Sequence, residues 1–116
     1  MDSRETVLAA AQAAYDKKAD DIIGIDLKGY TDVADYFLII TAANNRQMDA
    51  VIDEIEDRVY EKCSEKPFSI EGRAQGTWTV MDYGHVVVHV FTPETREYYR
   101  LESLWGDAPR VDLDLV

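Results

Sequence analysis

The stretch that most restricts the fold is YFLIIT, from Tyr36 to Thr41, because nearly every position in it is apolar. The side chains of a strand alternate between the two faces of a sheet, so a strand without this polar alternation is buried on both faces. The stretch has the length of a strand and is far shorter than the roughly 18 residues that a membrane-spanning helix needs. The sequence therefore predicts a central strand in a sheet covered by helices on both faces.

Three segments have the character of helices. Residues 5–17 place apolar side chains three and four positions apart, which is the stripe of an amphipathic helix. The segment NNRQMDAVIDEIEDRVYEKC repeats this spacing and begins with asparagines that can cap a first turn. A shorter helix is predicted after Thr92, with Pro93 in its first turn, and LESLW forms a last turn or a further helix.

Four more stretches are typical of strands, namely DIIGIDLKG, PFSIEG, WTVMDYG and HVVVHVF. The turn at Gly84 predicts an antiparallel pair, and the helical crossover from YFLIIT to PFSIEG favours a parallel pair. We therefore predict one α/β domain over residues 1–108, with a mixed, roughly five-stranded sheet and helices packed on it. Residues 109–116 are predicted to form a flexible C-terminal tail, because Gly106 and Pro109 interrupt regular structure there.

Acidic residues outnumber basic ones by 23 to 12, which gives a net charge of −11. Such a field opposes docking on nucleic-acid phosphates and favours a basic protein partner. The alternative is that the acidity only serves solubility or reflects a saline cytosol. The single cysteine and the lack of a signal-peptide pattern at the start indicate a cytoplasmic protein.

Few residues suggest catalysis or metal binding. His85 and His89 are expected on one face of a strand about 13 Å apart, too far to bind one metal, and His89 is expected to be a partly buried, hydrogen-bonded residue. Cys63 lies among acidic residues, which raise a thiol pKa. Asp112 and Asp114 form a D-x-D pair in the tail, with no glycine-serine loop before it. We predict no catalytic residue, no metal site and no cofactor.

The stretch WTVMDYG contains the most informative aromatic residues. Alternation places Trp78, Val80 and Asp82 on one face of the strand, and Thr79, Met81 and Tyr83 on the other. Tryptophan, tyrosine and methionine on a half-polar surface match the composition of protein-protein hot spots. Periodicity alone leaves open whether Trp78 is an interface residue or a core residue.

Three motifs stand in order along the chain: ADYFLIITAANNRQMDAVIDEIED, EGRAQGTWTVMDYGHVVVHVF and REYYRLESLW. In these motifs the sequence resembles the ribosomal silencing factor S family, also called Iojap-like proteins, from about Ala9 to Ala108. The resemblance implies a nucleotidyltransferase-like fold without catalytic residues and a role that is not enzymatic. Members bind ribosomal protein fourteen of the large subunit and sterically block joining of the subunits, which represses translation when nutrients are scarce. A part in large-subunit biogenesis is also implied.

The resemblance assigns protein-binding residues by position. These are Trp78, Met81, Asp82 and Tyr83 in the tryptophan-containing strand and turn, and Tyr98, Tyr99 and Glu102 in the aromatic and acidic motif that follows. Two departures stand out: His85 replaces the usual aspartate or asparagine, which puts a contact there in doubt, and TAANNRQ lacks the usual glycine or serine after the threonine. An exposed aromatic patch would also allow a weak homodimer of the free protein.

The alternative reading is an active nucleotidyltransferase. Such an enzyme needs clustered carboxylates at strand ends and a phosphate-binding loop. The sequence offers only Asp26 and Asp82 as scattered candidates. The anti-association factor is therefore the favoured prediction.

Overall fold

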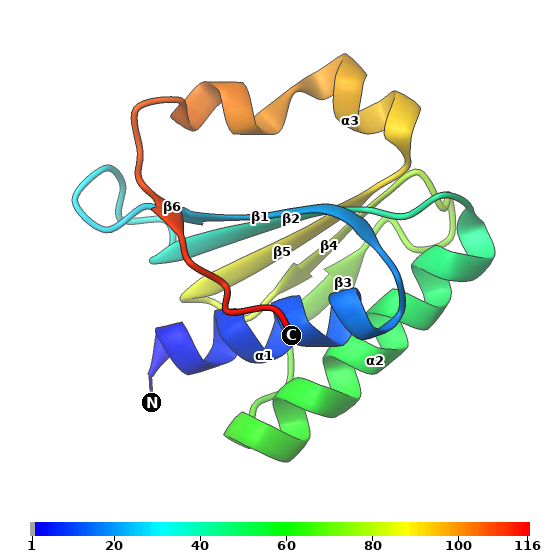
Figure 1. Ribbon diagram of the computed structural model, residues 1–116, viewed down its shortest axis with the longest axis horizontal. Helices are drawn as coiled ribbons and strands as arrows, with labels where there is room; N and C mark the ends of the chain where they lie inside the picture. Colours follow the sequence, from blue (N-terminus) through cyan, green and yellow to red (C-terminus); the bar gives the residue numbers. More distant parts are fainter. Residues whose placement is uncertain (1) are drawn as a thin grey trace.

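The computed structural model describes residues 2–116 (Figure 1). The helices are α1 (Ser3–Asp16), α2 (Asn45–Cys63), α3 (Pro93–Tyr99) and the 3₁₀ helix η1 (Leu101–Trp105). The strands are β1 (Asp20–Asp26), β2 (Tyr36–Thr41), β3 (Ser69–Glu71), β4 (Trp78–Asp82), β5 (Val86–Phe91) and β6 (Arg110–Val111). The mixed α/β class predicted from the sequence is confirmed.

All strands belong to one sheet with the order β3-β4-β5-β2-β1-β6. Every residue of β2 is buried, which confirms its predicted central place. The hairpin at Gly84 is also confirmed, since β4 pairs antiparallel with β5. The predicted parallel pair of β2 with PFSIEG is wrong, because the parallel neighbour of β2 is β5. After α2 the chain enters the sheet at its edge as β3. The antiparallel pairs β3-β4 and β4-β5 then lead the chain back, so that β5 lies beside β2 in the centre.

The helices form two unequal covers on this sheet. In Figure 1, α1 and α2 lie below the sheet, and α3 with η1 lies above it. The lower core is large and almost purely apolar, with Val7, Leu38 and Ile52 fully buried in it. The upper core is smaller and includes Phe37, Phe91 and the partly buried Trp78 and Trp105. The two faces therefore differ in both thickness and chemistry.

Side chains fix the start of α2 and the loop that lies beside the helix. Asn44 caps α2 by accepting a hydrogen bond from the backbone N–H of Gln47 at 2.9 Å. Arg73, in the loop between β3 and β4, donates to Asp49 and Asp53 of α2 at 3.1 and 2.7 Å. The loop that leads into Trp78 is thereby held against the helix.

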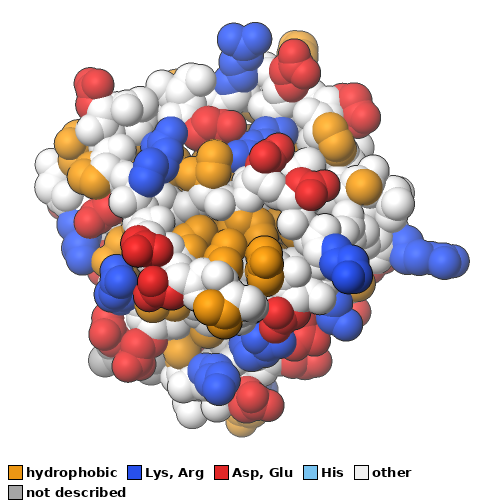
Figure 2. All heavy atoms as spheres, in the orientation of Figure 1, with side chains coloured by type: hydrophobic (Ala, Val, Ile, Leu, Met, Phe, Trp, Pro, Cys, Tyr) orange, Lys and Arg blue, Asp and Glu red, His pale blue; other side chains and the backbone are white. Residues whose placement is uncertain are grey.

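The C-terminal segment lies against the edge of the sheet instead of extending freely. Arg110 and Val111 pair with Ile25 and Gly24 of β1, which adds a sixth strand to the five predicted. Leu113 is only 8% exposed and packs into the lower core. Figure 2, in the orientation of Figure 1, shows hydrophobic side chains gathered in the middle of the visible side of the molecule and surrounded by charged ones. The expectation of a loose tail missed this burial, because a two-residue strand and one leucine leave no periodic signal.

No helix in residues 2–116 is long and apolar enough to cross a membrane. The mixed α/β architecture does not by itself distinguish a nucleotidyltransferase-like fold from other folds of this class, so the predicted relation to nucleotidyltransferases stays a prediction.

Candidate protein interface

Trp78 begins β4 and is partly buried on the upper face of the sheet. Its indole stacks on the ring of Phe91 at 5.0 Å between centroids, and it contacts the ring of Tyr99 at 4.8 Å. Tyr98 lies edge-on to Tyr99 at 5.0 Å. Tyr98 is 80% exposed and Tyr99 is 53% exposed. The structure thus brings Trp78, Tyr98 and Tyr99 together, and we call these three side chains the aromatic platform.

Next to the platform, β3 and β4 carry side chains that no helix fully covers. The register pairs Ser69 with Asp82 and Glu71 with Val80, so all four share the face of Trp78. Ser69 and Glu71 are exposed, and Val80 and Asp82 are partly buried. We call these four side chains the open strip. Its two carboxylates flank an apolar residue, which suits a basic partner with apolar contacts.

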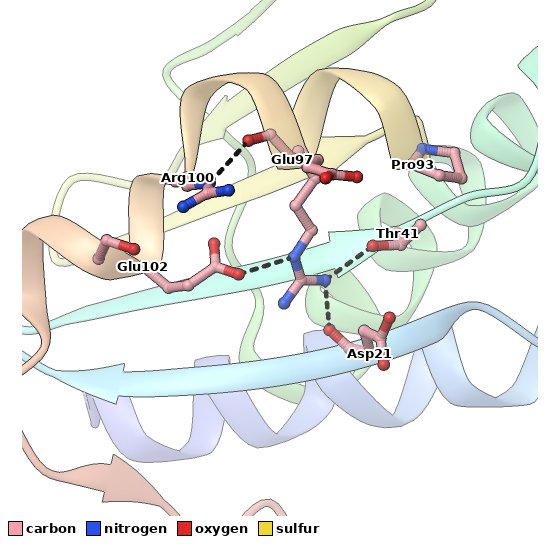
Figure 3. Close-up of a pocket in the computed structure, with 8 residues that line it drawn as sticks. Asp21, Thr41, Pro93, Glu97, Arg100 and Glu102 are labelled. Atoms are coloured by element: carbon pink, nitrogen blue, oxygen red, sulfur yellow. Dashed lines mark hydrogen bonds and ion pairs between the residues drawn. The ribbon is translucent and has the colours of Figure 1, made fainter.

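Arg96 holds α3 in place on the other side of the helix. The side chain is 8% exposed. Its guanidinium donates to the backbone oxygen of Asp21, to Thr41 Oγ1 at 2.7 Å and to Glu102 Oε1 at 3.2 Å. Figure 3 shows Asp21, Thr41 and Glu102 turned toward this point, from β1, β2 and η1. The network ties α3 to the start of β1 and the end of β2.

A pocket of about 510 Å³ opens beside this network. Its charged lining residues are two arginines, Arg96 and Arg100, and three acidic residues, Asp21, Glu97 and Glu102. Thr41, Pro93 and Ser103 complete the lining. Mixed charges of this kind favour neither a phosphate nor a cation. The pocket lies beside the Arg96 hydrogen bonds that anchor α3.

Two of the predicted protein-binding residues do not reach the surface. Met81 is fully buried and Tyr83 is 2% exposed, and both pack in the lower core. Strand alternation turns them away from Trp78, and α1 and α2 cover that face. Burial raises the pKa of the Tyr83 phenol well above its usual value. Met81 and Tyr83 therefore belong to the lower core, and neither side chain is available for contact with a partner.

Asp82 and Glu102 reach the surface in part but lie apart from the platform. Asp82 ends β4, four positions from Trp78, which corresponds to about 13 Å along a strand. Its Oδ1 accepts the backbone N–H of Gly84 at 2.7 Å and so shapes the turn. Glu102 pairs with Arg96 and belongs to the network on the other side of α3.

The two histidines take different positions. His89 is 6% exposed, which confirms the expected buried strand residue. The expected shared face is wrong: His85 precedes β5 in the turn and lies 3.4 Å from Thr6 of α1 and from Glu65, below the sheet. His89 instead contacts Phe37 at 4.8 Å between ring centroids, above it. The turn interrupts the alternation on which the expectation depended.

Other reactive groups are scattered. Burial raises the pKa of the Cys63 thiol, and the nearby Glu65 and Glu5 add to the effect. Asp26 and Asp82 stand on strands with two strands between them, a separation of about 14 Å at roughly 4.8 Å per strand. Within residues 2–116, no three His, Cys, Asp or Glu side chains gather as a metal site would require.

Comparisons with known proteins agree with this architecture. The sequence profile of the family described as "Ribosomal silencing factor during starvation" matches residues 1–116. The ribosomal silencing factor RsfS of Bacillus subtilis is 43% identical over 114 residues, which cover 98% of this chain and 96% of that protein. The chain belongs to the ribosomal silencing factor family.

A crystal structure of a Chromobacterium violaceum protein, CV0518, superposes on this ribosomal silencing factor family member with a TM-score of 0.86. The two are 34% identical, and the match covers 91% of this chain and 88% of that one. A Mus musculus relative is named "Mitochondrial assembly of ribosomal large subunit protein 1". It is 35% identical over 92 residues, which cover 77% of this chain and 40% of the mouse protein.

The sequence alone did not mark Glu71 as a neighbour of the platform, His89 as the hydrogen-bond partner of Trp78, or Arg96 as the residue that anchors α3. Glu71 shares the face of Trp78 only through the register of β3 with β4. A sharper signal was available for His89, whose place in a run of valines predicts a buried ring beside the paired strand. Arg96 lies in a short helix with charged neighbours, and no pattern marks it as buried.

Proposed function

We propose that the protein is a ribosomal silencing factor that binds the large ribosomal subunit and prevents the small subunit from joining it. Membership of the family supports a ribosome-associated role in silencing or assembly. The name of the mouse relative supports the large subunit as the site of action. On this proposal the chain works where translation takes place, in the cytoplasm, and limits protein synthesis when nutrients are scarce.

The observation that carries the proposal is the exposed aromatic platform beside an acidic strip. Two exposed tyrosines and a partly exposed tryptophan form an anchor of the kind that dominates binding energy at interfaces. Glu71 and Asp82 lie on the same face, and their negative charges would attract a basic surface of the partner. We infer that the partner is ribosomal protein fourteen of the large subunit, as the family resemblance implies.

The mechanism is steric and involves no chemical step. A chain with principal-axis extents of 34 × 32 × 28 Å, bound where two subunits meet, leaves no room for the second subunit. The net charge of −11 works against contacts with ribosomal RNA phosphates, so the binding energy must come from protein contacts. The carboxylates in the part of the chain that the structure describes form no cluster that would support the alternative of an active nucleotidyltransferase.

Sedimentation of purified subunits with the protein tests this function. We expect the protein to migrate with large subunits and to reduce the fraction of joined ribosomes when small subunits are added. A Trp78→Ala variant serves as the control for non-specific binding. Equal migration with small subunits, or unchanged joining at saturating protein, would contradict the proposal.

We also propose a weak homodimer of the free protein that uses the aromatic platform. Tyr98 at 80% exposure is a large apolar group to leave in water, and self-association would cover it. Light scattering over a concentration series should give a mass above 13.2 kDa that falls on dilution. A constant monomer mass at the highest concentration would rule the dimer out.

A further inference from the structure

In residues 2–116 the side chain of His89 takes part in one hydrogen bond, which it accepts from the indole of Trp78. The indole Nε1–H of Trp78 donates to His89 Nδ1 at 3.2 Å. The two rings lie 6.0 Å apart between centroids on neighbouring strands, where Val80 of β4 pairs with His89 of β5. Because Nδ1 accepts this bond, the proton of the neutral imidazole must be on Nε2.

The buried Nε2–H of His89 has no hydrogen-bond partner in the described residues. An unpartnered buried donor destabilises a fold, and a leucine or phenylalanine here would fill the space without that penalty. Burial also lowers the pKa of His89 to about 4, so the ring is neutral and Nδ1 remains an acceptor near neutral pH. Packing alone therefore does not account for a histidine at this position.

We propose that His89 is a positioning residue that fixes the orientation in which Trp78 meets its partner. Stacking on Phe91 and contact with Tyr99 hold the plane of the indole, but a flip of the ring by about 180° about its Cβ–Cγ bond keeps that plane and turns the other edge inward. The hydrogen bond selects one orientation, with the nitrogen-bearing edge turned inward. The inference rests on the proposed function, since it assigns a role within the same interface.

This orientation also defines what Trp78 recognises. Its N–H is already satisfied within the chain, so the exposed part of the ring offers an apolar surface and no donor. We infer that the group it contacts is an aliphatic stem or a ring of the partner. A preorganised anchor loses less conformational entropy on binding, which favours affinity.

Two variants separate positioning from packing. His89→Leu removes the acceptor and fills the space, and His89→Asn keeps an acceptor at the place of Nδ1. We expect His89→Leu to bind large subunits about fivefold to tenfold more weakly, the effect of one ordinary hydrogen bond. His89→Asn should restore most of this loss.

The indole N–H resonance of ¹⁵N-labelled protein reports the hydrogen bond directly. Trp105→Phe assigns the two tryptophan signals. The Trp78 signal should move strongly and broaden in His89→Leu, and it should stay near its wild-type position in His89→Asn. Thermal melts at pH 7.5 should show His89→Leu to be at least as stable as the wild type.

Three results would overturn the inference. One is wild-type affinity in His89→Leu with a displaced indole signal, and another is an unmoved indole signal. The third is a loss of stability that accounts for weaker binding in both variants. A separate result would contradict the proposed function itself: Trp78→Ala binding large subunits as well as the wild type.

Discussion

The two faces of the sheet differ in the helices that cover them and in the side chains that fill their cores. The lower face is sealed by two long helices, and its core residues are almost all aliphatic. The upper face is covered by a seven-residue helix and a five-residue 3₁₀ helix, and its contacts are made largely by aromatic rings. Three of the four buried polar atoms without a partner in residues 2–116 belong to this upper layer: His89 Nε2, Glu102 Oε2 and Trp105 Nε1.

This difference teaches where stability and binding reside. A thick aliphatic core can carry most of the free energy of folding. A thin aromatic layer with imperfect hydrogen bonding contributes less, and it leaves rings at the surface for a partner. Substitutions on the two faces should therefore separate loss of folding from loss of binding.

The largest effect is expected below the sheet. Leu38→Ala removes a fully buried side chain of the central strand and leaves a cavity between β2 and the helices. We expect a loss of about 2 to 5 kcal/mol in the free energy of unfolding, measured by denaturant titration. Affinity of the fraction that stays folded should be unchanged. A loss below about 1 kcal/mol would show that the lower core is loosely packed.

Acid should weaken the upper face through His89. Its pKa falls from 6.5 in the unfolded chain to about 4 in the folded protein. Between these values the unfolded chain binds a proton that the folded chain does not, so stability falls as the pH drops from 6.5 to about 4. The full effect is roughly 3 kcal/mol.

His89→Leu isolates this effect from the titration of carboxylates, which is common to both proteins. Denaturant titrations from pH 7.5 to 4 should show the difference between variant and wild type growing in favour of the variant. Parallel curves over the whole range would mean that His89 is solvated in the folded state.

Trp78→Ala should have the largest effect on binding. Loss of a central aromatic anchor commonly costs 2 kcal/mol or more, about thirtyfold in affinity. The ring contacts of Trp78 with Phe91 and Tyr99 are worth about 1 to 3 kcal/mol together, so the variant should lose part of its stability and remain folded. Binding to large subunits and a thermal melt measure the two quantities. A loss of about 3 to 5 kcal/mol in stability would make Trp78 a core residue.

The smallest effect is expected at the edge of the open strip. Asp82→Asn keeps the acceptor for the backbone N–H of Gly84 but removes one charge that faces a basic partner. We expect affinity to fall about twofold to fivefold and to depend less on salt. Asp112→Asn is the matched control, because its side chain likewise accepts a backbone N–H, from Asp114. Equal effects of the two changes would indicate a general charge effect.

Much of the fold could be predicted from local pattern. The burial of YFLIIT, the helix with apolar positions at Met48, Val51 and Ile55, and the turn at Gly84 each follow from periodicity or from one residue type. The parallel partner of β2 could not be predicted in this way. Pairing of strands distant in sequence depends on the whole topology, and the β3-β4-β5 order leaves no local mark.

The candidate site divides in the same manner. Alternation predicts that Trp78 and Asp82 share a face, and the structure confirms this. Family position alone assigned Met81 and Tyr83 to the interface, although alternation placed them on the opposite face. Which of the two faces is covered by helices is a tertiary property. The sequence therefore indicated the strand of the candidate interface but not which of its two faces the helices bury.

The short strand β6 has a consequence for the behaviour of the protein at high concentration. An uncovered β1 would present a row of free backbone groups to the β1 of another molecule, which is how sheets join into aggregates. Arg110 and Val111 occupy part of that row. Leu113 packs so closely on Gly24 that a Cβ atom at residue 24 would lie 2.9 Å from the Cδ2 atom of Leu113. The opposite edge, β3, has only three residues. A chain cut before Pro109, or one with a side chain at residue 24, should therefore precipitate under conditions in which the intact chain does not.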